Sequence, residues 1–151
     1  MNLLSLAFVA LTLFFNPGGQ TPPAQTPAPA PTPALSKEVQ ALQGAWTVTL
    51  FNDQDPGGAL GLQFEGNKYM VIINGSGDES GTFKLDTSKT PWTFDLNIEQ
   101  GSDAGKLQLG ILEMKGDAIH GLLGTPGVNT RPAAFDSADG AIAFVAVKVK
   151  K

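Results

Sequence analysis

The sequence predicts an all-β fold: an eight-stranded antiparallel up-and-down barrel with a short N-terminal helical turn. Short segments of alternating apolar and polar residues recur along the chain, as half-buried strands do. The connections between them are short, which favours antiparallel neighbours. The 18 glycines supply turns and fit an all-β chain better than a helical one. Eight such strands avoid exposed edges by closing into a barrel, and two packed sheets are the competing architecture.

The composition excludes several classes of function. The chain has 151 residues, with 10 Lys and Arg against 14 Asp and Glu, and therefore lacks the basic excess of a nucleic-acid-binding protein. It has no cysteine, which excludes disulfides, thiolate nucleophiles and thiol-ligated metals. A metal site would need mostly oxygen ligands, because there is one histidine. We expect no nucleic-acid partner, no cofactor and no metal.

Residues 1–16 are predicted to be a signal peptide, or an N-terminal anchor if they are retained. Their apolar run, Leu3–Phe15, matches a signal-peptide core and is short for a membrane span of about 20 residues. Residues 17–34 are rich in proline, which predicts an extended, disordered linker. We expect an exported protein, periplasmic, at the cell surface or secreted, that meets a membrane only through an uncleaved N-terminal segment.

The predicted domain, residues 35–151, begins with a helical turn and continues as strands. Leu35, Val39 and Leu42 have helical spacing, and Ser36 can cap the turn. The segment "GSGDESG", residues 75–81, is predicted to be a hairpin turn, because it lacks the Lys-Ser/Thr and the helix of a phosphate-binding loop. The predicted strands cover residues 46–50, 60–65, 68–74, 82–86, 92–98, 106–114, 118–123 and 141–150.

Alternation within the strands predicts which side chains face inward. Pro91 lacks a backbone N–H and suits the first position of a strand. Trp92 then begins an inward set on that strand. The sets that alternation predicts to face inward are Trp46, Val48 and Leu50; Leu60, Leu62 and Phe64; Phe83 and Leu85; Trp92, Phe94 and Leu96; and Leu107, Leu109 and Ile111.

Short motifs with compatible spacing follow one another through the domain. They are Leu42–Trp46 (LQGAW), Phe64–Asn67 (FEGN), Gly81–Asp86 (GTFKLD), Lys89–Pro91 (KTP), Asp95–Leu96, Gly116–Asp117 and Arg131–Phe135 (RPAAF).

From about Leu35 to Lys150 this ordered set resembles an uncharacterised lipocalin-like secreted domain family of planctomycete-type bacteria. The resemblance implies a lipocalin-like barrel, with Trp46 plugging one end of it. It implies no activity, because none is established for the family. The motif residues that it implies to be structural are Gly44, Trp46, Gly81, Asp86, Pro91, Arg131, Pro132 and Phe135.

No residue set predicts catalysis or metal binding. Asp53 and Asp55 lack the spacing of a calcium-binding loop and are interpreted as a turn. His120 lies opposite Ile119 by alternation, so we expect it on the outer face, without a catalytic role. Arg131 has three interpretations: a guanidinium packed over a ring and held by carbonyls or a carboxylate, an exposed loop side chain, or a ligand contact.

Three acids on one predicted strand and its following loop are interpreted as solvated, not as an acid/base pair. They are Asp95, Glu99 and Asp103.

The leading hypothesis is an exported, tethered binding module and not an enzyme. An eight-stranded barrel either fills completely or holds one small ligand. The ligand would be apolar or amphipathic, because no polar group points to a specific ligand class. The alternative is a structural or protein-interaction domain with a filled barrel, and in either case we expect a monomer. The possible ligand-lining or core residues are Trp46, Phe64, Tyr69, Phe83, Trp92 and Phe94.

Overall fold

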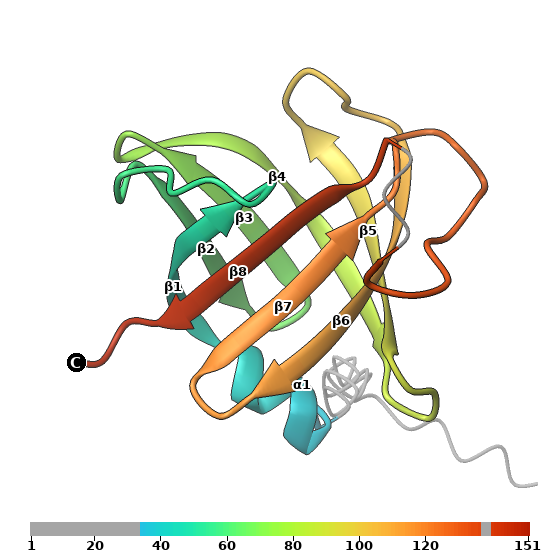
Figure 1. Cartoon of the computed structure of the whole chain (residues 1–151), viewed down its shortest axis with the longest axis horizontal. Coiled ribbons are helices and arrows are strands. Elements are labelled where there is room, and N and C mark those ends of the chain that lie inside the picture. Colours follow the sequence, from blue (N-terminus) through green and yellow to red (C-terminus); the bar gives the residue numbers. More distant parts are fainter. Residues whose placement is uncertain (1–33, 137–139) are drawn as a thin grey trace, which may run out of the picture. The chain divides into compact units, whose positions relative to one another are not determined.

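The described part of the chain is a closed barrel of eight antiparallel strands (Figure 1). The computed structural model describes residues 34–136 and 140–151. Each strand pairs with the next along the chain, and β8 closes the barrel on β1. The predicted up-and-down barrel is confirmed, and the two-sheet alternative is wrong. The elements are α1 Lys37–Leu42, β1 Gly44–Phe51, β2 Leu60–Glu65, β3 Lys68–Ile73, β4 Ser76–Asp86, β5 Trp92–Gln100, β6 Leu107–Lys115, β7 Ala118–Leu123 and β8 Ile142–Lys148.

The predictions for the N-terminal region fall almost wholly outside this structure. The signal peptide or anchor, residues 1–16, and the linker, residues 17–34, lie outside the described residues except for Ala34. Within the described ranges, no helix combines the length and the apolar character that crossing a membrane requires. Export and tethering therefore stay predictions.

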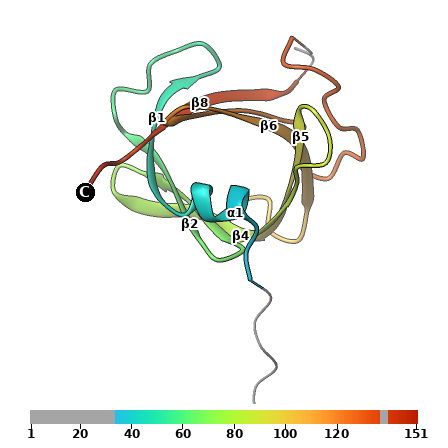
Figure 2. The same cartoon turned by 90° about the horizontal axis from the view of Figure 1, so that it is seen from below.

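The up-and-down topology sorts the connections between the two ends of the barrel. The β2–β3, β4–β5 and β6–β7 turns lie at the end that also carries α1, which we call the closed end. The β1–β2, β3–β4, β5–β6 and β7–β8 connections lie at the opposite, open end. Figure 2 shows α1 lying across the opening at the closed end.

Hydrogen bonds fasten α1 to the closed end. The predicted cap is confirmed, since the Ser36 hydroxyl oxygen accepts from the Val39 N–H at 3.3 Å. After the helix, Gln43 accepts from the Gly66 N–H through Oε1 at 2.6 Å and donates to the Gly66 carbonyl through Nε2 at 3.0 Å. These paired bonds tie the end of α1 to the β2–β3 turn, and Leu42, the last residue of the helix, is fully buried.

Trp46 fills the barrel interior next to α1, at the closed end. Only 2% of its surface is exposed, and its indole Nε1 donates to the Leu42 carbonyl at 2.7 Å. Lys148 Nζ lies 5.4 Å from the centre of the Trp46 ring and donates to the Ala41 carbonyl at 2.8 Å. Trp46 thus joins β1, β8 and α1, which is the plugging position that the resemblance implies.

The predicted inward faces of β4 and β5 are confirmed. Phe83 pairs with Leu96, and Leu85 pairs with Phe94. The rings of Phe83 and Phe94 lie 5.7 Å apart, and Phe64 approaches Phe83 edge-on at 5.3 Å. Favourable edge-to-face aromatic packing therefore stabilises the centre of the core.

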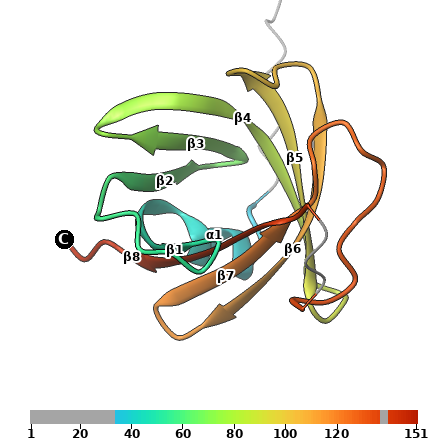
Figure 3. The same ribbon diagram turned by 45° about the horizontal axis from the view of Figure 1, so that its top comes forward.

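The predicted inward face of β6 is wrong. Phe94 pairs with Gly110 and Leu96 pairs with Gln108, so the even-numbered residues of β6 face inward. Leu107, Leu109 and Ile111 belong to the outer face. Ile111 is nevertheless buried. The long β7–β8 connection runs outside the barrel beside β5 and β6 (Figure 3), and its Arg131 bonds to Asp95 and Gly110 on these strands. Both faces of β6 carry apolar side chains, and alternation could not distinguish them.

The predicted inward position of Leu50 is also wrong. The pairing of β1 with β8 shifts between Val48 and Leu50, which leaves Thr49 as the extra residue of a β-bulge. A bulge moves the following side chains to the other face. Leu50 is therefore 40% exposed, and Phe51 takes the inward position.

Candidate functional site

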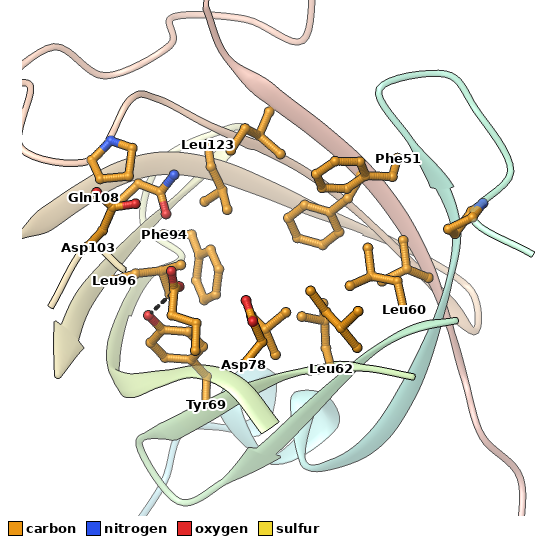
Figure 4. A pocket seen from close by; sticks show the side chains of 18 of the residues that line it. Phe51, Leu60, Leu62, Tyr69, Asp78, Phe94, Leu96, Asp103, Gln108 and Leu123 are labelled. Atoms are coloured by element: carbon orange, nitrogen blue, oxygen red, sulfur yellow. Dashed lines mark hydrogen bonds between the residues drawn. The ribbon is translucent and has the colours of Figure 1, made fainter. Parts of the chain in front are cut away.

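A cavity of about 430 Å³ opens at the open end of the barrel (Figure 4). This volume lies within the range of about 300–1,000 Å³ that is typical of small-molecule sites. Most of the lining side chains are apolar, and they come from all eight strands and three open-end connections. The lining residues are Val48, Phe51, Pro56, Ala59, Leu60, Leu62, Phe64, Tyr69, Val71, Ile73, Asp78, Glu79, Phe94, Leu96, Asp103, Gln108, Leu123, Pro126, Ile142 and Phe144.

The six predicted lining or core aromatics divide between the cavity and the packed core. Phe64, Tyr69 and Phe94 line the cavity. Trp46 and Phe83 are buried in the core outside it, and the half-buried Trp92 packs against that core. Alternation specifies the face of a strand but not the depth along the barrel axis, so it could not separate the two groups.

Two acidic residues line the cavity from a segment that was predicted to be a turn. Residues 76–80 belong to β4, not to a hairpin loop, because their backbone pairs with β3 and in part with β5. Val71 pairs with Glu79 while Ile72 pairs with Gly77, so Asp78 is the extra residue of a second bulge. A bulge can direct two successive side chains toward one side. Asp78 and Glu79 both reach the cavity for this reason, and Figure 4 shows Asp78 pointing into it.

Tyr69 and Glu79 form a hydrogen-bonded pair in the cavity wall. The Tyr69 hydroxyl donates to Glu79 Oε1 at 2.9 Å. Partial burial raises the pKa of Glu79, the Tyr69 bond opposes this, and the nearby Asp103 and Asp78 carboxylates add to the rise. The pKa of Tyr69 is raised, mainly by burial. The hydrogen bond to Glu79 and the negative charges of Glu79 and Glu99 raise it further. Tyr69 therefore stays a neutral donor, and Glu79 carries its charge at a free-energy cost.

Gln108 is the second polar group deep in the wall. It is 3% exposed, and its Nε2 donates to the Gly124 carbonyl at 2.7 Å. In Figure 4 its amide lies beside Asp103 and faces the cavity. Asp103 itself is held by Lys106, with Nζ and Oδ1 2.7 Å apart. Gln108 was missed in the sequence because the wrong face of β6 was taken as inward.

Two glycines of the sequence motifs, Gly44 and Gly81, are required by the backbone geometry. Gly44 begins β1 with φ of +105°, a conformation that other residues rarely adopt. Gly81 lies where β4 and β5 approach closely, and a Cβ there would be 2.0 Å from the Asn97 carbonyl oxygen. Their structural roles concern the backbone and not the cavity.

Asp86 and Pro91 shape the β4–β5 turn at the closed end. The Ser88 hydroxyl donates to Asp86 Oδ1 at 2.6 Å, and the Ser88 N–H donates to the same oxygen at 3.0 Å. Both bonds lower the pKa of Asp86, and the bond from the Ser88 hydroxyl has the larger effect. Pro91 follows a cis peptide bond and directly precedes β5.

Arg131 fixes the β7–β8 connection to the outside of the barrel. Its Nη1 donates to the Asp95 carboxylate and, at 2.7 Å, to the Gly110 carbonyl. The exposed-loop interpretation is therefore wrong, as is the interpretation of Asp95 as simply solvated. Pro132 is buried next to Arg131, whereas Phe135 is 37% exposed. These motif residues lie outside the cavity lining.

The remaining polar candidates, His120 among them, lie outside the cavity lining. His120 lies on the outer face opposite Ile119, as predicted, although it is half-buried. Within residues 34–136 and 140–151, no three His, Asp or Glu side chains are grouped so that they could hold a metal ion. Comparison with protein-family models, curated proteins and solved structures finds no match for this chain.

Glu79→Gln is expected to stabilise the protein at pH 7. The raised pKa means that the folded state favours the protonated acid more than the unfolded state does. The resulting penalty is full above the raised pKa and disappears as the pH falls below the ordinary value of about 4.3. The glutamine oxygen can still accept from Tyr69. We expect a higher urea midpoint for the variant at pH 7, with the difference closing at acid pH.

Glu65→Gln is the matched control for this substitution. Glu65 is exposed at the end of β2, on the closed side of the barrel. Its replacement should change the free energy of unfolding by no more than about 0.5 kcal/mol at either pH. If Glu79→Gln instead destabilises the protein at pH 7, the charged bond to Tyr69 outweighs the cost of burial.

Proposed function

We propose that this protein is an exported, tethered, lipocalin-like module that binds one small apolar or amphipathic molecule inside its barrel. The observation that carries the proposal is the cavity of about 430 Å³ at the open end. A filled structural barrel would have its interior closed by side chains at both ends. Here α1 and Trp46 occupy one end only, and apolar walls lead inward from the other.

Export and tethering rest on the N-terminal sequence alone. The apolar run Leu3–Phe15 and the proline-rich residues 17–34 support them. The resemblance to the lipocalin-like secreted family adds to this support. N-terminal sequencing of the protein from its host tests cleavage, and an intact Met1 in the membrane fraction would indicate an anchor instead.

Nile red, a neutral apolar dye, tests ligand binding by the full chain. We expect a saturable rise in its fluorescence at one site per chain. Leu62→Trp should weaken this binding by roughly tenfold or more, because the indole ring would occupy the cavity that Leu62 lines. Ala59→Trp at the cavity wall gives the same test if Leu62→Trp does not fold.

Leu107→Trp is the control for an added tryptophan. Leu107 is 47% exposed on the outer face of β6, so its replacement should leave dye binding unchanged. If the folded wild-type chain shows no saturable uptake, the protein is a structural or interaction domain and the proposal is wrong.

A further inference from the structure

The polar groups of the cavity lining present mainly hydrogen-bond acceptors to a molecule inside it. Tyr69 and Gln108 are the two neutral polar residues of the lining, and each donates to a protein oxygen: Tyr69 to Glu79 and Gln108 to the Gly124 carbonyl. Among the described residues, no donor reaches Gln108 Oε1 or the Asp78 carboxylate. Gln108 is a deeply buried residue, but no fully buried side-chain nitrogen or oxygen among the described residues lacks a partner, so its unbonded oxygen is open to the cavity and can accept from a molecule there.

The charge of the cavity wall has one sign. Asp78, Glu79 and Asp103 line it, and no Lys, Arg or His is part of the described lining. Lys106 compensates Asp103 from outside the lining, whereas Asp78 and Glu79 have no cationic partner in the described part of the chain. Repulsion among these acids contributes to the raised pKa of Glu79. A cation between them would remove the repulsion.

The backbone is shaped so that both acids reach the same place. In a regular strand, the successive residues Asp78 and Glu79 would point to opposite faces. The bulge at Asp78 instead directs its side chain toward the cavity, beside that of Glu79. Below these acids the walls are apolar, with Leu62, Val71 and Leu96 among the side chains. The cavity is therefore acidic where Asp78 and Glu79 lie and apolar beyond them.

We propose that the cavity selects amphipathic amines: molecules with an apolar body and a protonated amino group. The body lies against the apolar wall, and the ammonium group donates to Asp78, Glu79 and Gln108 Oε1. This inference rests on the proposed function and adds the chemical class of the ligand. An ammonium group bonded to a carboxylate contributes about 1.5–3 kcal/mol, or roughly tenfold or more in affinity over a neutral head group.

Binding of decylamine, decanol and decanoate to the full chain at pH 7 tests the proposal. The three share one apolar chain and differ in the charge of the head group. We expect decylamine to bind roughly tenfold or more tightly than decanol, and decanoate to bind most weakly. Equal affinities, or a preference for decanoate, would overturn the amine selectivity while leaving the apolar site intact. Failure of all three to bind folded protein would overturn the proposed function itself.

Paired substitutions assign the selectivity to the two acids. Asp78→Asn with Glu79→Gln should reduce decylamine affinity by roughly tenfold and decanol affinity by much less, because the amide oxygens still accept from a hydroxyl group. The retained decanol binding also reports that the cavity of the variant is intact, and each single substitution gives the same test if the pair does not fold. Glu65→Gln removes one negative charge at the closed end, which matches each single substitution, and should alter neither affinity. An equal loss of decylamine binding in Glu65→Gln would show that only net charge matters and would contradict the proposed site.

Discussion

Trp46→Ala is expected to remove most of the stability of the barrel. Trp46 is fully packed between β1, β8 and α1, and replacing a buried tryptophan with alanine costs about 3–5 kcal/mol. The substitution also leaves the Leu42 carbonyl without its indole donor and Lys148 without its ring. The free energy of unfolding of a small domain is only about 5–15 kcal/mol. Urea denaturation should therefore show a large fall in midpoint, and α1 should lose protection from hydrogen exchange first.

Leu50→Ala, on the same strand, is the control for Trp46. Leu50 is exposed because of the bulge at Thr49, so its loss should cost about 1 kcal/mol or less. A regular strand without the bulge would bury Leu50 and raise this cost to about 2–5 kcal/mol. A Leu50→Ala effect as large as that of Trp46→Ala would contradict the register of β1.

Gly81→Ala is expected to cost about 3 kcal/mol or more. The added Cβ would meet the Asn97 carbonyl oxygen at 2.0 Å and the Asn97 carbonyl carbon and the Glu99 nitrogen at 3.0 Å. All three atoms are backbone, so the clash can be relieved only by moving β5 away from β4. Because Gly81 also pairs with Tyr69, the same movement should weaken Nile red binding.

Gly77→Ala is the matched control on the same strand. A Cβ at Gly77 meets only the flexible side chain of Met70, with Sδ at 3.3 Å. We expect a change of about 1 kcal/mol or less in the free energy of unfolding. Equal costs for the two alanine variants would show that the contact between Gly81 and Asn97 does not restrict β4.

The sequence was sufficient for the fold class and for most strands. Alternation, short connections and the turn residues predicted eight antiparallel strands, and the inward set Trp92, Phe94 and Leu96 is confirmed. These signals are local, since one buried face imposes a period of two on each strand. The predicted helical turn capped by Ser36 is local in the same sense.

Bulges and the outer covering of β6 account for the errors. The bulges at Thr49 and Asp78 depend on pairing with a second strand, which a single strand's sequence does not reveal. Ile111 is buried although it lies on the outer face, next to Gly110, to which Arg131 of the β7–β8 connection donates, so its apolar character resembles that of a core residue.

The cavity was only partly predictable for a related reason. The aromatics were assigned to the interior, but whether each lines open space or packs against a neighbour depends on depth along the barrel. Phe64 and Phe83 have adjacent rings, yet only Phe64 lines the cavity. The polar lining was missed because Glu79 lay in a predicted turn and Gln108 on the face taken as outer.

A methyl NMR titration of the full chain with decanol tests the central claim most directly. The account predicts saturable shifts at methyl groups that line the cavity, such as those of Leu60, Leu62 and Val71. Methyl groups of Val39 and Leu42 at the closed end should not shift. Shifts confined to outer-face residues such as Leu107, or the absence of saturable shifts in a folded spectrum, would contradict it.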